Sequence, residues 1–344
     1  MEQVFQTLEG AGGALCVTVA DAASGLRAFI ALDDTTLGPA AGGVRTMRYP
    51  SAAEGLADAL GLARAMTLKC ALAGLDAGGG KAVVLAPDAW IDRARAFERL
   101  GEAIEALRGV FRTAGDLGTT AADLEAMARA SRFVHTDERG LAGAVARGLL
   151  RCVEACAAVR GESVAGLHVA VQGAGAIGAR AARAFAEAGM IVTLADIDAA
   201  RAWAVAADIP GTRVMDPGEI LGADVDIVAP CAGGGVITTE VAMSMRAWAV
   251  CGAANNALAS MEAARVLSAR GILHVPDPVA SAGAVIDGIG RSVMGLADRT
   301  ELIDRLGDTA REVLEEAARG GRTTVEVAEA RARGRIAAAR GRRA

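Results

Sequence analysis

The sequence is poor in the residues that build several kinds of reactive site. It has three histidines, one tyrosine and three tryptophans, and aromatic residues make up only 3% of the chain. The six cysteines are scattered without a CxxC pair, and Cys152 and Cys156 lie one helical turn apart with no histidine nearby. A zinc site needs several such ligands at suitable spacing. We therefore expect no metal centre, few candidates for a histidine-based triad, and ordinary thiols at helix or core positions.

The chain also lacks a long apolar segment. Its longest stretch without a formal charge, about 17 residues over 163–179, is broken by His168, Gln172 and several glycines, so no membrane span is expected. The first residues have neither the basic nor the apolar region of a secretion signal, which predicts a cytoplasmic protein. The formal charge of −5 predicts no general attraction to nucleic acid. The arginine-rich stretch 319–344 is the exception, and we expect it to be a solvated helix face with a frayed end.

The composition that remains is that of a globular protein. The 344 residues are 53% hydrophobic and 22% charged, which suggests about two domains. Short apolar runs alternate with helix-period stretches up to about residue 135, and a strict alternation of strands and helices follows, which is typical of a parallel sheet covered on both faces. We predict an α/β fold with one domain over 1–136, a Rossmann-type doubly wound domain over 137–320, a hinge near 137–143, and a C-terminal helix with a basic tail over 321–344.

A glycine-rich turn is the sharpest local motif. It directly follows an apolar strand and opens a helix, and it consists of Gly173, Ala174, Gly175, Ala176, Ile177 and Gly178. Asp196 lies 18 positions after the last glycine, at the end of the next predicted strand. Such glycines let a pyrophosphate approach a helix N-terminus, and the carboxylate accepts hydrogen bonds from ribose hydroxyls while repelling a 2′-phosphate. The motif predicts a dinucleotide site that prefers NAD to NADP.

The first half contains a second group of candidate residues. Lys69 ends a predicted helix, Lys81 begins a strand just after three glycines, and Asp116 follows a strand in a Gly-Thr turn. Each could be a salt-bridged surface residue. Apolar neighbours around both lysines favour the other interpretation, in which a lysine desolvated in a cleft has a lowered pKa and exchanges protons near neutral pH.

Eight sequence blocks, spread over nearly the whole chain, carry a resemblance to a known family. They are GPAAGGVR (38–45), AMTLK (65–69), GGGKAVV (78–84), AGDLGTT (114–120), VQGAGAIG (171–178), APCAGGGVITTEVA (229–242), GAANNAL (252–258) and RGILHVPD (270–277). In content and order they resemble the glutamate/leucine/phenylalanine/valine family of amino acid dehydrogenases, the phenylalanine dehydrogenases most and the leucine dehydrogenases next. The resemblance implies NAD-dependent oxidative deamination of an L-amino acid to a 2-oxo acid with release of ammonia, and the reverse reductive amination.

The resemblance also implies roles for the first group of residues. Lys69 would bind the substrate carboxylate, and Lys81 would contact the carbonyl or amine and the attacking water. Asp116 would be the acid/base partner, and the backbone at Gly42 and Gly43 would line the amino acid site. Loss of a hydride from Cα would give an iminium, to which water adds before ammonia leaves.

In the second half the resemblance implies that Gly173, Gly175, Gly178 and Asp196 hold NAD. Cys231 and Ala232 would flank a ribose of the cofactor. Asn255 would reach the nicotinamide end and the substrate.

Small residues mark the expected side-chain pocket. Glutamate-specific relatives carry a lysine just before the paired glycines, whereas this chain has Ala41, so the resemblance favours an apolar substrate. Ala114, Val285 and Gly288 resemble other pocket positions and leave room for a bulky group. We favour phenylalanine or a similar aromatic amino acid as substrate. Leucine or valine is the alternative, because one methylene in a pocket changes the discrimination between substrates by only about 1–3 kcal/mol.

Two stretches depart from the family pattern. The linker before the cofactor domain is short and has no hydroxyl residue between Thr136 and Ser163, and Ser281-Ala282-Gly283-Ala284 replaces Asn-Ala-Gly-Gly. These departures motivate an alternative, a catalytically silent NAD-binding protein, and a third hypothesis is a dehydrogenase of another small ligand such as an imine. The resemblance further implies a homo-oligomer formed through the N-terminal domain.

Overall fold

The computed structural model describes residues 2–10 and 15–342, and the chain divides into two compact units. The first unit comprises Met1–Arg139, Gly288–Ala297 and Arg333–Ala344, and the second comprises Gly140–Asp287 and Asp298–Ala332. The predicted two-domain α/β fold with a helical C-terminal segment is confirmed. Two later segments return to the first unit, which the predicted division at 136 and 320 did not include. Arg343 and Ala344, the end of the expected basic tail, lie outside the described residues.

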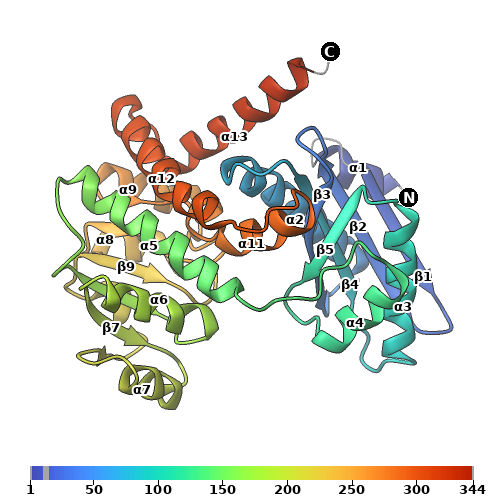
Figure 1. Cartoon of the computed structure of the whole chain (residues 1–344), viewed down its shortest axis with the longest axis horizontal. Helices are drawn as coiled ribbons and strands as arrows, with labels where there is room; N and C mark the ends of the chain where they lie inside the picture. Colours follow the sequence, from blue (N-terminus) through green and yellow to red (C-terminus); the bar gives the residue numbers. More distant parts are fainter. Residues whose placement is uncertain (1, 11–14, 343–344) are drawn as a thin grey trace. The chain divides into compact units, whose positions relative to one another are not determined.

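The first unit is built on a mixed five-stranded sheet (Figure 1). Its strands are β1 Leu15–Asp21, β2 Leu26–Asp34, β3 Ala40–Met47, β4 Gly78–Leu85 and β5 Phe111–Gly115, and its helices are α1 Glu2–Gly10, α2 Ala52–Leu72, α3 Arg93–Ala106 and α4 Ala121–Ala130. The spatial order is β1-β2-β4-β3-β5, with β3 parallel to both neighbours and β2 antiparallel to β1 and β4. The strand β3 therefore lies between β4 and β5.

Helices cover both faces of this sheet because its strands are apolar on both sides. Along β2, Ile30 packs into a core with Phe97 and Leu100 of α3. The next residue, Ala31, points to the other face and joins a core with Leu56 and Leu60 of α2. Side chains of a strand alternate between faces, so a strand buried on both sides becomes almost continuously hydrophobic.

The second unit contains the parallel sheet that the sequence predicted (Figure 1). Its strands are β6 His168–Gln172, β7 Ile191–Ala195, β8 Arg213–Val214, β9 Ile227–Pro230, β10 Ala249–Val250 and β11 Leu273–His274. Its helices are α5 Leu141–Val159, α6 Ala176–Glu187, α7 Ala199–Ala207, η1 Ile220–Gly222, α8 Thr239–Ser244, α9 Met261–Ala269, α10 Asp277–Ala280 and α12 Thr300–Gly320, while α11 Gly283–Ser292 and α13 Thr324–Gly341 have residues in both units.

Strand order places the nucleotide motif of the second unit. The order is β11-β10-β9-β6-β7-β8, and all five pairs are parallel. The chain runs outward from β6 through β7 to β8 and then returns to β9 on the other side of β6. In open parallel sheets ligands bind beyond the carboxyl ends of the strands at such a reversal. The glycine-rich turn follows β6 and thus lies at this position.

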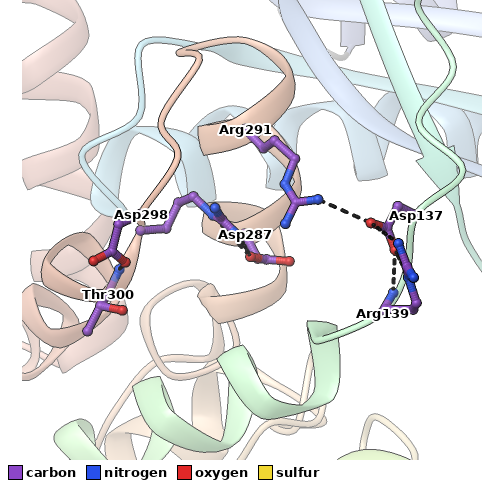
Figure 2. A network of polar contacts seen from close by, with 7 residues as sticks. Asp137, Arg139, Asp287, Arg291, Asp298 and Thr300 are labelled. Carbon is purple, nitrogen blue, oxygen red and sulfur yellow. Dashed lines mark hydrogen bonds and ion pairs between the residues drawn. The ribbon is translucent and has the colours of Figure 1, made fainter.

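Polar contacts fix two segments near the points where the chain passes from one unit to the other (Figure 2). In the first unit Asp137 accepts hydrogen bonds from Arg139 (Nε–Oδ1, 2.8 Å) and from Arg291 of α11 (Nη1–Oδ2, 3.1 Å). In the second unit Arg299 donates to Asp287 through Nε at 3.1 Å. The linker between α4 and α5 and the loop after α11 are therefore each fixed by contacts within their own unit.

Two expectations about absent features can be compared with the structure. Within residues 2–10 and 15–342, none of the helices combines the length and apolarity needed to cross a bilayer. All six cysteines, each in the described ranges, are free thiols. Burial raises the pKa of Cys70 to about 12 and that of Cys231 to about 11, so these thiols stay protonated at neutral pH.

A buried histidine of the second unit predicts an acid-sensitive fold. His274 on β11 contacts Thr324 (Nδ1–Oγ1, 3.1 Å), and burial lowers its pKa to about 4. The unfolded chain takes up this proton near pH 6.5, so the folded state loses stability as pH falls from about 6.5 to about 4, by up to about 3 kcal/mol. Urea denaturation of wild type and His274→Gln at neutral pH and near pH 5 measures the effect. The stability difference between the two proteins must shrink on acidification, and a constant difference would contradict the prediction.

Candidate active site

Lys81 and Asp116 approach each other across strand β3 of the first unit. Val44 of β3 pairs with Ala82 on one side and with Gly115 on the other, so the two charged residues flank β3 at one level. A Cβ at Gly43 would lie 2.8 Å from the Cβ of Asp116. Real Cβ atoms do not approach so closely, so Asp116 can cross over β3 only because residue 43 is glycine.

The two side chains form a largely buried ion pair. Lys81 Nζ lies 2.7 Å from Asp116 Oδ2, with 8% and 25% of the respective side chains exposed. Burial lowers the pKa of Lys81, and the negative charge of Asp116 offsets part of that effect. Burial alone would raise the pKa of Asp116, but the charges and hydrogen bonds of Lys81 and Arg45 outweigh it, so the pKa is lowered. The Lys81 ammonium group therefore loses its proton more readily than that of an exposed lysine.

Arg45 is a site residue that the sequence interpretation missed. It donates to the same carboxylate oxygen of Asp116 (Nε–Oδ2, 2.9 Å) and contacts Asp58 through Nη1 at 3.3 Å. Tyr49 in turn donates to Asp58 at 2.6 Å. Strand periodicity contained the signal, because residues 43 and 45 of one strand face the same side and Asp116 lies over residue 43.

Lys69 is positioned by a close helix–strand contact. It lies in the last turn of α2, and the residue is buried at 8% exposure. A Cβ at Gly79 of β4 would lie 2.2 Å from the Ala63 carbonyl oxygen and from Thr67 N, so the backbone of α2 rests directly on this glycine. Thr67 also donates to Asp33 at 2.7 Å. The glycine-rich start of β4 thus fixes the end of the helix that carries Lys69.

The composition adds a signal that the sequence interpretation did not use. Of the 36 lysine and arginine residues, 34 are arginine, and the two lysines are Lys69 and Lys81. Both are buried. Arginine stays protonated in proteins, whereas a buried lysine can shift its pKa and release a proton. Lysine at these two positions, in a chain that otherwise uses arginine, indicates a chemical requirement.

The predicted pocket residues fall in different parts of the chain. Ala41 is buried on β3 and Ala114 pairs with Gly43 from the neighbouring strand β5, so these two lie close to the Lys81–Asp116 pair. Val285 and Gly288 lie on α11, on either side of the division between the units. Their roles in binding a substrate side chain stay predictions.

The glycine-rich turn has the geometry that a dinucleotide requires. Gly173 has φ +101°, and a Cβ at Gly178 would lie 1.9 Å from the Gly173 carbonyl oxygen, so both positions need glycine. A Cβ at Gly175 would meet no described atom within 4 Å. Gly175 is the N-cap of α6, and among the described residues no side chain caps this helix. Its first N–H groups therefore border open space, as expected of a pyrophosphate site.

Asp196 directly follows β7 and accepts two backbone hydrogen bonds. Ala174 N donates to Oδ2 at 2.7 Å and Asp198 N donates to Oδ1 at 2.8 Å. Burial would raise the pKa of Asp196, but these bonds and the Arg201 guanidinium outweigh it and lower the pKa. The carboxylate is ionised and linked directly to the glycine-rich turn, so these residues fit the adenosine end of a dinucleotide.

The other cofactor candidates surround the same turn. Ala232 lies against Gly173, and Cys231 N donates to the Gln172 carbonyl at 2.7 Å. Asn255 contacts Ser281, whose Oγ lies 3.3 Å from Asn255 Oδ1 and 2.6 Å from the Asp277 carbonyl oxygen, to which it donates. Ser281, which departs from the family pattern, thus supports the side chain predicted to reach the nicotinamide. The structure brings the second-unit candidates together around the carboxyl ends of β6 and β9.

Comparisons with known proteins agree with this arrangement. Residues 15–133 match the model of the Glu/Leu/Phe/Val dehydrogenase dimerisation domain, and residues 205–342 match that of glutamate/leucine/phenylalanine/valine dehydrogenase. The chain is 38% identical to a leucine dehydrogenase of Geobacillus stearothermophilus over 78% of this chain and 75% of that protein. It is 35% identical to a phenylalanine dehydrogenase of Bacillus thermotolerans over 94% and 88%.

Solved structures show the same relationship. The crystal structure of L-tryptophan dehydrogenase from Nostoc punctiforme superposes with a TM-score of 0.87 at 31% identity, covering 98% of this chain and 99% of that one. A hetero-hexameric glutamate dehydrogenase from Thermus thermophilus shares the fold at 22% identity and a TM-score of 0.75, covering 100% and 95% of the chains. With its ion pair, its glycine-rich turn and two matched domains, this chain belongs to the glutamate/leucine/phenylalanine/valine family of amino acid dehydrogenases.

Proposed function

We propose that the chain catalyses NAD-dependent oxidative deamination of an apolar L-amino acid, with phenylalanine or a similar aromatic substrate preferred, and the reverse reductive amination. The observation that carries the proposal is the buried Lys81–Asp116 pair over Gly43. A general acid and base must lie within hydrogen-bond reach and have a pKa suited to proton transfer. Lys81 Nζ and Asp116 Oδ2 lie within hydrogen-bond reach of each other, and burial lowers the pKa of Lys81 from that of an exposed lysine.

The residues of the first unit have distinct roles in this proposal. Lys69 binds the substrate carboxylate, and the backbone at Gly42 and Gly43 lines the space beside it. Lys81 and Asp116 exchange protons with the substrate nitrogen and with the oxygen of the attacking water. Arg45 keeps Asp116 ionised and oriented, so the carboxylate accepts a proton only transiently.

The second unit holds the cofactor in this proposal. The α6 N-terminus at Gly175 receives the pyrophosphate, Asp196 accepts from the adenosine ribose, and Asn255, supported by Ser281, lies at the nicotinamide end. NAD, when bound, accepts the hydride from the substrate Cα. The protein supplies orientation and excludes water.

Two alanines beside the ion pair support an apolar substrate. Ala41 and Ala114 beside the ion pair are small and uncharged. The relatives described above that share 31–38% identity with the chain are named for leucine, phenylalanine and L-tryptophan. Leucine or valine is the alternative substrate class.

An assay of 2-oxo acids tests the proposed reaction. Purified protein is mixed with NADH, ammonia and, in turn, phenylpyruvate, indolepyruvate, 4-methyl-2-oxopentanoate, 3-methyl-2-oxobutanoate and 2-oxoglutarate, and the loss of NADH absorbance is followed. We expect turnover with the aromatic acids first and none with 2-oxoglutarate. NADH binding without turnover across the panel would instead favour a silent NAD-binding protein.

The first unit also supports a proposal about assembly. Its residues 15–133 match a domain described as a dimerisation domain. We propose a homo-oligomer formed through this unit. Light scattering of the purified protein measures the mass, which must be a whole multiple of 34.7 kDa and at least twice that value; a mass of one chain would contradict the proposal.

Coenzyme preference gives a quantitative prediction. Replacing Asp196 with serine removes the charge that repels a 2′-phosphate, and Arg201, whose Nη1 lies 3.4 Å from Asp196 Oδ1, is left to attract it. We expect the ratio of kcat/KM for NADPH to that for NADH to rise about 100-fold. Adding Arg201→Ala to the same variant should remove most of the gain. A ratio unchanged by Asp196→Ser would contradict the assignment of Asp196 to the ribose.

A further inference from the structure

The second half of α13 contacts two loops that flank the glycine-rich start of β4. Arg335 donates through Nη1 to the carbonyl oxygens of Ala71 (2.9 Å) and Cys70 (3.3 Å). Its Nη2 pairs with Asp76 at 3.2 Å. Arg340, farther along the helix, pairs with Asp34 at 2.8 Å. These contacts all lie within the first unit.

Arg335 caps the helix that carries Lys69. The last carbonyls of a helix carry a partial negative charge, so a guanidinium there is favourable. The Cys70 and Ala71 carbonyls also accept from Leu75 N (3.0 Å) and Gly74 N (3.4 Å), so Arg335 is a second donor to each of them. Cys70 and Ala71 are the two residues directly after Lys69, and both are buried. The guanidinium therefore holds the backbone next to the residue that would bind the substrate carboxylate.

The same side chain also holds the turn between the two lysines. Asp76 lies between Lys69 at the end of α2 and Lys81 on β4. A Cβ at Gly38 would lie 2.0 Å from the Asp76 carbonyl oxygen, so this turn is packed from its other side as well. Arg335 thus joins the end of α2 to the turn that leads into β4, and its contacts fix the spacing of the two lysine backbones.

We propose that Arg335 is a positioning residue for substrate binding, which sets the place of Lys69 by capping α2 and pairing with Asp76. The inference rests on the proposed function, because it needs Lys69 to bind the substrate carboxylate. The hydrogen bonds and the ion pair of Arg335 go to Cys70, Ala71 and Asp76, and not to the Lys81–Asp116 pair. Its loss should therefore weaken substrate binding more than it slows proton transfer.

The chain provides a matched control on the same helix. Arg340 also forms an ion pair within the first unit, with Asp34 at the end of β2, but its side chain is 69% exposed, whereas that of Arg335 is 30% exposed. Exposed ion pairs contribute little to stability. Arg340→Met therefore makes the same chemical change at the same helix without removing a helix cap.

The experiment compares Arg335→Met and Arg340→Met in the full-length protein. We measure KM and kcat for the preferred 2-oxo acid, the Kd of NADH from its fluorescence, and the thermal midpoint. For Arg335→Met we expect KM to rise about 10- to 100-fold, since hydrogen bonds to a charged group are lost. We expect kcat to change by less than about threefold and the Kd of NADH to stay at the wild-type value. For Arg340→Met all four quantities should stay near wild type.

Two further variants keep the proposal testable if Arg335→Met folds poorly. Arg335→Lys keeps the charge but cannot contact two carbonyls and Asp76 together, so its KM should be intermediate. Asp76→Asn weakens only the ion pair, so its KM should rise less than that of Arg335→Met.

The outcomes separate the two proposals. An active wild type in which Arg335→Met and Arg335→Lys have the KM of Arg340→Met overturns the inference and leaves the proposed function intact. Equal losses in oxo acid and NADH binding overturn it too, because they indicate a general structural defect. A wild type that turns over no 2-oxo acid overturns the proposed function, and the inference with it.

Discussion

Replacing Lys81 with methionine is expected to lower kcat by about 1,000-fold, while the Kd of NADH stays at the wild-type value. Methionine has a similar length and suits the buried position, so the change removes the amine with little effect on packing. Asp116 keeps its contact with Arg45 at 2.9 Å and stays ionised. The dinucleotide motif belongs to the other unit. Steady-state assays with the preferred 2-oxo acid and fluorescence titration with NADH measure the two quantities.

Lys69→Met is the matched control, because these are the two lysines of the chain. In the proposed function Lys69 binds the carboxylate without exchanging protons, so its loss should raise KM far more than it lowers kcat. If the two variants had the same split between KM and kcat, the separate roles of the lysines would be wrong. A fully active Lys81→Met would overturn the proposed mechanism.

The pKa of Lys81 can be measured directly, because the chain contains two lysines. Protein grown with [ε-13C]lysine gives two lysine signals, and the one missing from Lys81→Met belongs to Lys81. Burial lowers the pKa of Lys81, whereas Asp116 raises it, so Asp116→Asn should lower it further. A signal that titrates like a free lysine in both proteins would show that Lys81 is not desolvated.

Local patterns predicted the elements that carry the chemistry. The glycine-rich turn, the strand before it and Asp196 all lie within residues 168–196, so their geometry follows from a short stretch of chain. The Lys81–Asp116 contact depends on strand order, which places β3 between β4 and β5. Local propensity does not contain that order, and the family resemblance supplied the pairing instead. Arg45 was missed for this reason, although strand periodicity places it beside Gly43.

The division of the chain was the least predictable feature. The segment 288–297 and the end of α13 belong to the first unit, far from it in sequence. Contacts such as that of Arg335 with the end of α2 join residues more than 260 positions apart. The arginine-rich tail was expected to be a solvated helix face, and many of its arginines are exposed. Arg335 is half-buried, and two of its partners are backbone carbonyls, which no side-chain pattern in the sequence reveals.

A substitution of one glycine at the contact between α2 and β4 should have the largest effect on stability. We expect Gly79→Ala to lower the free energy of unfolding by about 4 kcal/mol, because the new Cβ would overlap the backbone of α2. It would lie 2.2 Å from the Ala63 oxygen and from Thr67 N, and neither backbone atom can rotate away. The helix must shift instead, and Lys69 in its last turn shifts with it. The surviving folded protein should therefore also have a raised KM for the 2-oxo acid.

Gly61→Ala is the control for this prediction, and it should raise the free energy of unfolding instead of lowering it. Gly61 lies inside α2 on the exposed side, and a Cβ there would meet no described atom within 4 Å. Alanine favours a helix interior over glycine by about 1 kcal/mol, so this variant should be slightly more stable than wild type. Urea denaturation of the three proteins measures both effects. If Gly79→Ala were as stable as Gly61→Ala, α2 would not rest on β4 at this glycine, and the placement of Lys69 would have to be revised.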